Sequence, residues 1–145
     1  MSKSNAFENS FLLLLLNNTN IANVGDATGL RGSTVAGSLF LSLHTADPGE
    51  AGDQSTSEVT YTSYGRATVA RSAAGWTVAA NSATLTSIIS FAAGTGGSGT
   101  ATHFGLGTAS SGAGVLLYKG AVTPNIVCGN GVTPQLTTAT AITED

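Results

Sequence analysis

The sequence predicts an all-β fold, a single antiparallel β-sandwich or jelly-roll-like domain that follows a short N-terminal helix and an extended arm. Within residues 38–44, Leu39, Leu41 and Leu43 alternate with other side chains, which is the period-two pattern of a β-strand. Further runs rich in Thr, Val, Ile and aromatic residues follow, and Gly, Ser, Asn and Pro separate them at intervals of about 8–12 residues. This spacing is typical of β-sandwiches and small barrels, and no strict internal repeat accompanies it.

The β-rich part of the chain contains several candidate strands. We expect them over residues 39–44, 58–63, 66–71, 76–80, 83–91, 101–107, 115–122, 126–128 and 135–142. The Gly-rich stretches 94–99 and 110–114 are short and favour hairpin loops over linkers. The expected organisation is an N-terminal helix and arm over residues 1–37, followed by a β-sandwich domain over residues 38–145.

Residues 5–17 have the pattern of one helix. Ser4 or Asn5 can cap its N-terminus, and Glu8 follows Asn5 by three residues, as in a capping box. The leucine run 12–16 makes the helix apolar almost all round, so every side of it must be buried. Either a neighbouring subunit or the domain's own sheet covers it, and the sequence leaves both alternatives open.

The apolar run within this helix and the segment after the helix lead to two further expectations. The apolar run 11–16 is too short to cross a membrane, which takes about 20 residues, and the polar residues around it disfavour a signal peptide. Residues 17–38 are polar and interrupted by glycines, and we expect them to form an extended arm that lies against another surface.

Charge is scarce in this chain. Lys and Arg total 5, Asp and Glu total 8, and charged residues make up 9% of 145 positions, against roughly 25% in an ordinary domain. The basic residues are scattered, which excludes a face that neutralises several phosphates, so no direct nucleic-acid contact is expected. The one cysteine, Cys128, excludes an intrachain disulfide and a multi-cysteine zinc site.

The densest polar cluster combines His44 with Asp47, Glu50 and Asp53. A histidine and three carboxylates can hold a divalent metal or act as acid and base. Their spacing differs from that of a calcium-binding hand, and Asp47-Pro48-Gly49 favours a turn. We interpret the cluster as a solvated hairpin loop, with no metal site.

No other segment predicts a catalytic or cofactor site. His103 lies in a β-pattern without a Gly-x-Ser-x-Gly elbow nearby, and Cys128 precedes a glycine turn as a small core residue would. Residues 94–99 are Gly-rich but lack the lysine and helix of a phosphate loop. We therefore expect a protein that is not an enzyme and has no cofactor and no small-molecule substrate.

Two arginines and the apolar helix supply the candidate interface. Arg66 and Arg71 lie five residues apart on one expected strand, so they point to opposite faces, and each is expected to meet a carboxylate or a backbone carbonyl. Subunit interfaces are enriched in arginine. The candidate interface residues are Phe7, Phe11, Leu12, Leu13, Leu16, Arg66 and Arg71.

The large aromatic residues leave a second class of function open. Trp76, Tyr61, Tyr64 and Tyr118 fit core or interface positions, and they would also suit a carbohydrate-binding adhesion module if they lay on the surface.

Four motifs in the β-rich part lie at residues 42–52 (SLHTADPGEAG), 64–67 (YGRA), 102–106 (THFGL) and 116–121 (LLYKGA). Through them, residues 38–122 resemble a family of small virion proteins of tailed bacteriophages, whose members are labelled tail fibre or head structural protein. These are packing and turn motifs, so they specify a fold better than a role.

The resemblance implies a non-enzymatic, β-rich component of the virion, made in the host cytoplasm. Small size, low charge and an arm favour a capsid decoration (cement) protein on the outer surface of the head. Its expected partners are the major capsid protein and copies of itself, as a dimer or trimer. A tail or tail-fibre subunit is the alternative.

Overall fold

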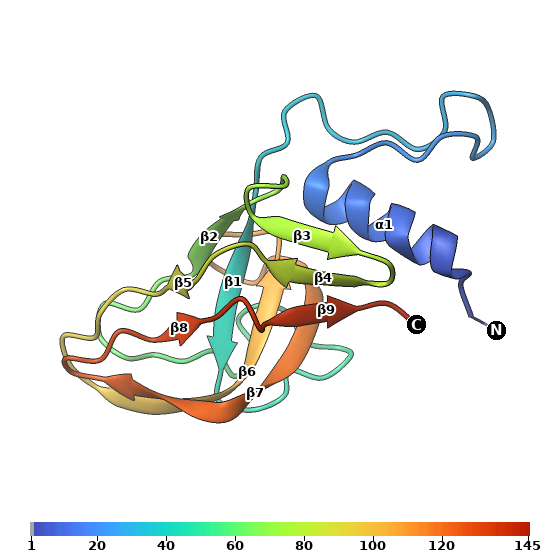
Figure 1. The fold of residues 1–145 in the computed structure, drawn as a ribbon. Coiled ribbons are helices and arrows are strands. Elements are labelled where there is room, and N and C mark those ends of the chain that lie inside the picture. The colour runs from blue at the N-terminus through green and yellow to red at the C-terminus, as the bar shows by residue number, and fades with distance from the viewer. Residues whose placement is uncertain (1) are drawn as a thin grey trace. The chain divides into compact units, whose positions relative to one another are not determined.

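The computed structural model describes residues 2–145. It is an all-β fold with one N-terminal helix and antiparallel sheets, which confirms the predicted fold class (Figure 1). Its elements are α1 (Asn5–Asn17), β1 (Ser38–His44), β2 (Ala67–Ala70), β3 (Trp76–Ala79), β4 (Ser82–Leu85), β5 (Ile89–Ser90), β6 (Ser98–Gly107), β7 (Leu116–Gly129), β8 (Gln135–Leu136) and β9 (Ala141–Thr143).

The chain forms two compact units, each assembled from separated segments. The first, here called the helical unit, comprises Met1–Ser38, Ala70–Ile88 and Thr137–Asp145. The second, the sheet unit, comprises Leu39–Val69 and Ile89–Leu136. The division into residues 1–37 and 38–145 stays a prediction.

The helical unit packs α1 against a small sheet ordered β3-β4-β9. Ser4 caps the helix, as the sequence predicts, and its hydroxyl accepts a hydrogen bond from the Phe7 backbone N–H. Leu12 and Leu16 are fully buried, and so is Trp76 on β3. The chain itself therefore covers Leu12 and Leu16, the first and last members of the leucine run, so these two leucines need no neighbouring subunit to be buried.

Arg71 and Asn18 close the other end of α1. The Arg71 guanidinium donates to the carbonyl oxygens of Leu14 and Leu15, both at 2.6 Å, and to Asn18 Oδ1 at 2.7 Å. Asn18 itself is the left-handed C-cap, with φ 57°. The last turn of α1 contains no basic residue, so Arg71 supplies the positive charge that favours a helix C-terminus from another segment.

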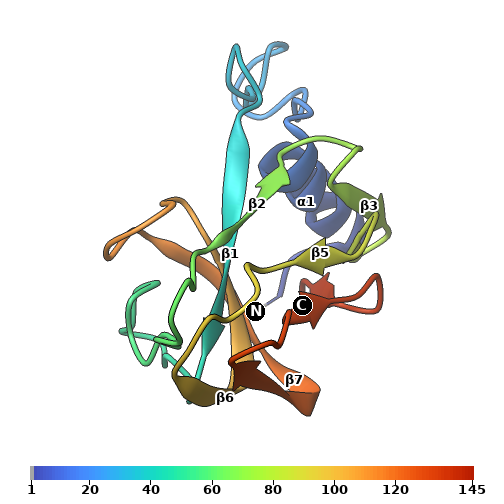
Figure 2. The same cartoon turned by 90° about the vertical axis from the view of Figure 1, so that its left-hand side faces the viewer.

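The sheet unit is built on a four-stranded antiparallel sheet ordered β2-β1-β6-β7. β1 pairs with β6 from Phe40 opposite Gly107 to His44 opposite His103. β7 is the edge strand beyond β6 (Figure 2), and the short strands β5 and β8 pair with each other. Apolar side chains of β1 and β6 form the core, namely Leu39, Leu41, Leu43, Ala101, Phe104 and Leu106.

Several predicted strands are divided or absent in the structure. Residues 83–91 form two strands, β4 and β5, because the chain leaves the helical unit for the sheet unit between them. Residues 135–142 divide into β8 and β9 for the same reason. Residues 58–63 make only isolated bridges, and Ser63 has φ 78°, which ends extended structure.

The two strands predicted at 115–122 and 126–128 are one continuous strand, β7, through Pro124. A proline lacks the N–H that an internal strand donates, so it is tolerated on this edge strand.

Candidate functional site

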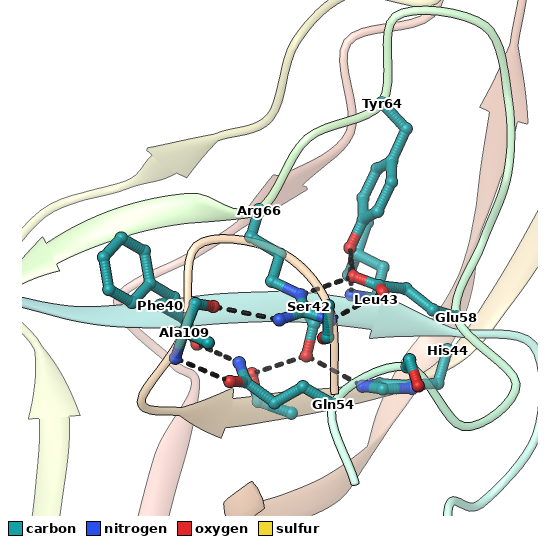
Figure 3. Close-up of polar contacts among 12 residues, drawn as sticks. Phe40, Ser42, Leu43, His44, Gln54, Glu58, Tyr64, Arg66 and Ala109 are labelled. Atoms are coloured by element: carbon teal, nitrogen blue, oxygen red, sulfur yellow. Dashed lines mark hydrogen bonds and ion pairs between the residues drawn. The ribbon is translucent and has the colours of Figure 1, made fainter. Parts of the chain in front are cut away.

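The centre of the sheet unit holds a buried polar cluster, formed by residues on β1 and on the loops that follow it (Figure 3). Arg66 and Glu58 form a bidentate ion pair, with Nε–Oε1 and Nη2–Oε2 distances of 2.8 Å. The Arg66 side chain is only 2% exposed. Its remaining N–H groups donate to the carbonyl oxygens of Ala109 at 2.9 Å and Gly112 at 2.6 Å, so the charge is both paired and hydrogen-bonded.

Tyr64 joins this ion pair to β1. Its hydroxyl donates to Glu58 Oε1 at 2.8 Å and accepts from the Leu43 backbone N–H at 3.1 Å (Figure 3). Burial raises the pKa of Tyr64, which keeps the phenol neutral and able to donate. The ring stacks on Phe91 at a centroid distance of 6.2 Å. Tyr64 therefore fixes the loop before β2 onto the sheet.

His44 and Ser42 form a second part of the cluster. The Ser42 Oγ–His44 Nε2 distance is 2.8 Å, and His44 Nδ1 lies 2.8 Å from the Thr56 carbonyl oxygen. Because a carbonyl oxygen only accepts, Nδ1 carries the proton and Nε2 accepts from Ser42. Burial lowers the pKa of His44.

A serine paired with a histidine is a catalytic arrangement in many hydrolases. Here both side chains are fully buried, and the third partner is a backbone carbonyl in place of a carboxylate. Because Gly105 has no side chain, it leaves room for Ser42 and His44. A Cβ at this position would lie 2.6 Å from His44 Nε2. The Ser42–His44 pair thus links β1 to a loop and to β6, and its hydroxyl does not face solvent.

Gln54 completes the cluster and is fully buried. Its Nε2 donates to the Phe40 carbonyl oxygen at 3.1 Å, and its Oε1 accepts from the Ala109 backbone N–H at 2.9 Å (Figure 3). Neither Gln54 nor Glu58 stands out in the sequence as a candidate site residue. Neither belongs to a motif, and the partners of Gln54 are backbone groups that side-chain patterns do not reveal.

The surface of the same unit carries a second polar cluster around Lys119 on β7. The ammonium lies 3.0 Å from Asp47 Oδ1 and 3.2 Å from Glu50 Oε1. The Gly49 backbone N–H, and after it Lys119, lower the pKa of Asp47, while the hydrogen bond to Asp47 raises that of Lys119. A pocket of about 280 Å³ opens beside these residues, lined by Gly49, Glu50, Gly52, Leu116, Leu117, Tyr118 and Lys119.

The predicted cluster of His44, Asp47, Glu50 and Asp53 does not converge. His44 is buried, Asp47 and Glu50 meet Lys119, and Asp53 accepts hydrogen bonds from Ser55. Across residues 2–145, no group of three or more His, Cys, Asp or Glu side chains is placed to hold a metal ion.

The predicted interface residues occupy three kinds of position. Leu12 and Leu16 are buried within the chain, Phe11 and Leu13 are half-buried, and Phe7 is partly exposed. Arg66 meets a carboxylate and Arg71 meets backbone carbonyls, which confirms the kind of partner expected for each arginine. A role for any of the seven residues in binding another subunit stays a prediction.

Of the remaining chemical candidates, Cys128, Trp76 and Tyr61 are buried and His103 is half-exposed. Cys128 is buried, and burial raises the pKa of its thiol, so it lacks the character of a reactive cysteine. His103 Nδ1 hydrogen-bonds the neighbouring Thr102 hydroxyl at 2.9 Å. Trp76 and Tyr61 are buried and present no ring to solvent. In the described part of the chain, no helix is long and apolar enough to span a membrane.

This β-rich fold, whose polar groups mainly tie loops to a sheet, is compatible with the structural role that the sequence predicts. In agreement, residues 2–142 match the family model described as podophage GP4 fiber I protein gp80. The chain belongs to this family, and it is a structural protein of the phage virion. No curated protein matches the chain.

The four motifs that carried the resemblance meet in the sheet unit. Residues 42–52 and 64–67 supply His44, Tyr64 and Arg66, and residues 102–106 supply the glycine beneath His44. Residues 116–119 line the surface pocket. The motifs therefore supply part of the polar cluster and the pocket lining, while Gln54 and Glu58 lie outside them.

Proposed function

We propose that this protein is a structural subunit of the phage tail fibre and has no catalytic role. The observation that carries the proposal is the match of residues 2–142 to a family whose description names a fibre protein. The sequence by itself favours a head decoration protein, with a tail or tail-fibre subunit as the alternative. We place the fibre subunit first because the family description names a fibre protein.

The sequence supports a fibre component other than a long shaft. Long fibres are built from repeated segments, and this sequence has no strict repeat. The buried cluster around Arg66 and Glu58 joins loops far apart in the sequence, as a rigid building block requires. The Ser42–His44 pair is enclosed, which supports a non-enzymatic role.

A decoration protein bound to the major capsid protein is the second candidate. Its support is the exposed apolar side chains of the arm, such as Val35, which is 79% exposed and available to a neighbouring subunit.

Deletion of the gene from the phage that encodes this chain separates the two candidates. If the chain is a fibre subunit, the deletion should give particles that lack fibre density and adsorb poorly to the host. Their heads should keep the wild-type temperature of genome release. Intact fibres on heads that release their genome at a lower temperature would instead favour the decoration protein, because a cement protein stabilises the assembled shell by binding it.

A further inference from the structure

The surface pocket of the sheet unit lies along the start of an unpaired strand edge. β7 pairs with β6 on one side and is the last strand of its sheet on the other. Leu116, Leu117 and Lys119 of β7 line the pocket, and Gly49, Glu50 and Gly52 form its opposite wall. Exposed strand edges present free backbone groups and are common sites of protein association.

The charge of this pocket favours a cation. Two carboxylates, Asp47 and Glu50, share the single ammonium of Lys119, which leaves one negative charge in excess. The Glu50 side chain is 96% exposed, so no other part of the chain has to move before it pairs with a further cation. Leu116 and Leu117 add apolar surface next to that charge.

The helical unit offers a matching surface on the loop after α1, here called the arm loop (residues 18–37). Arg31 is exposed and has no carboxylate partner within residues 2–145, whereas Lys3, Arg66 and Lys119 all form ion pairs. The neighbouring Leu30 is also exposed, at 42%. A cation beside an exposed apolar side chain complements a pocket with excess negative charge and leucine walls.

The arm loop holds this pair of residues in a formed conformation. Leu30 exchanges two backbone hydrogen bonds with Ile21, at 2.8 and 2.9 Å. Directly after Arg31, the Gly32 N–H donates to Asn20 Oδ1 at 2.9 Å, and Asn18 bonds the backbone of Ser33. A surface that is ordered before binding loses less conformational entropy on association.

We propose that the arm loop of one copy docks into the β7 pocket of a second copy, with Arg31 paired to Glu50 and Asp47 and Leu30 packed on Leu116 and Leu117. The two surfaces differ, so the contact is heterologous and adds copies head to tail, in a ring or an open row. This contact goes beyond the proposed function, since a fibre and a head lattice can both contain it.

Charge reversal in the purified full-length chain tests the pairing. Sedimentation velocity across a concentration series is expected to show self-association that weakens with added salt. Arg31→Glu and Glu50→Arg should each weaken that association at least tenfold, and the double variant should restore it within about threefold. Asn125→Arg, which adds charge at an exposed position of β7 outside the residues that line the pocket, is the matched control and should leave association unchanged.

Cross-linking between two single variants tests the geometry. A mixture of Leu30→Cys and Leu117→Cys chains should give a cross-linked pair of unlike chains that neither variant gives alone, since Cys128 is buried. A chain that stays monomeric at all concentrations overturns the proposal. Failure of the double charge reversal to restore association, or absence of the mixed cross-link, overturns it as well.

Discussion

Arg66 and Glu58 meet inside the sheet unit as a bidentate pair, and this contact explains why Tyr64 and Arg66 occur two residues apart in one motif. In an extended segment, residues two apart point to the same side. Tyr64 and Arg66 accordingly both reach Glu58, each through a 2.8 Å hydrogen bond to Oε1. The guanidinium also donates to the carbonyls of Ala109 and Gly112, so one side chain joins the connection between β1 and β2 to the loop between β6 and β7.

Removal of Arg66 should therefore destabilise the fold. Arg66→Ala leaves the Glu58 carboxylate and two carbonyls without their partner, and we expect a loss of about 3–5 kcal/mol in the free energy of unfolding. Urea denaturation of the full-length chain measures it. Asn125→Ala, at an exposed position on the edge strand β7, is the control and should change stability by less than about 0.5 kcal/mol. Similar losses for the two variants would contradict the role of the ion pair.

Two glycines of β6 provide a matched test of close packing. A Cβ at Gly105 would lie 2.6 Å from His44 Nε2 and 2.7 Å from Ser42 Oγ, whereas one at Gly99 meets nothing within 4 Å. Gly105→Ala should lower the melting temperature, with a stability loss of about 1–3 kcal/mol. Gly99→Ala should be neutral or stabilise by up to about 1 kcal/mol. If the two variants melt together, the packing of His44 against β6 is wrong.

The hydrogen bonds from Arg71 to α1 predict a local effect. Arg71→Gln keeps a polar side chain but removes the charge and most of the donors at the helix C-terminus. We expect a loss of about 1.5–3 kcal/mol, together with faster hydrogen exchange in the last turn of α1 and in the arm loop. Exchange in β6 serves as the internal control and should follow only the global change in stability. Unchanged protection of the last turn of α1 would argue against the capping role.

His44 predicts a pH dependence of stability. Its folded pKa lies below the usual 6.5, so the unfolded chain takes up a proton first as the pH falls. Stability should therefore decrease from about pH 6.5 downward, above the range in which the carboxylates titrate. Urea denaturation at pH 7 and pH 5 measures the decrease.

His44→Gln and His103→Gln separate the two histidines in that measurement. The decrease should be lost in His44→Gln and persist in His103→Gln, whose ring is half-exposed. Persistence of the decrease in His44→Gln would show that another group titrates.

Local patterns predicted part of this fold well. The helix over residues 5–17 and its Ser4 cap follow from chemistry within one turn, and β1 follows from alternation over seven residues. The segment 58–63 also has strand composition, but the Tyr61 and Ser63 hydroxyls bond to Ala92 and Thr95 in a distant loop. Strand propensity alone does not reveal that such side-chain hydrogen bonds compete with strand pairing.

The candidate site was harder to predict for the same reason. The sequence indicated that Arg66 would meet a carboxylate or a carbonyl, and it meets both. It gave no sign of Gln54, whose partners Phe40 and Ala109 are 14 and 55 residues away. The pocket beside β7 depends on a loop and a strand about 70 residues apart, which only the fold brings together.

A cryo-electron microscopy reconstruction of the intact virion tests the central claim most directly, namely that this chain is a structural subunit of the fibre. The helical and sheet units, fitted separately, should account for density in the fibres attached to the tail, with none on the head lattice. Density for these units on the outer surface of the head, or their absence from the particle, would contradict it.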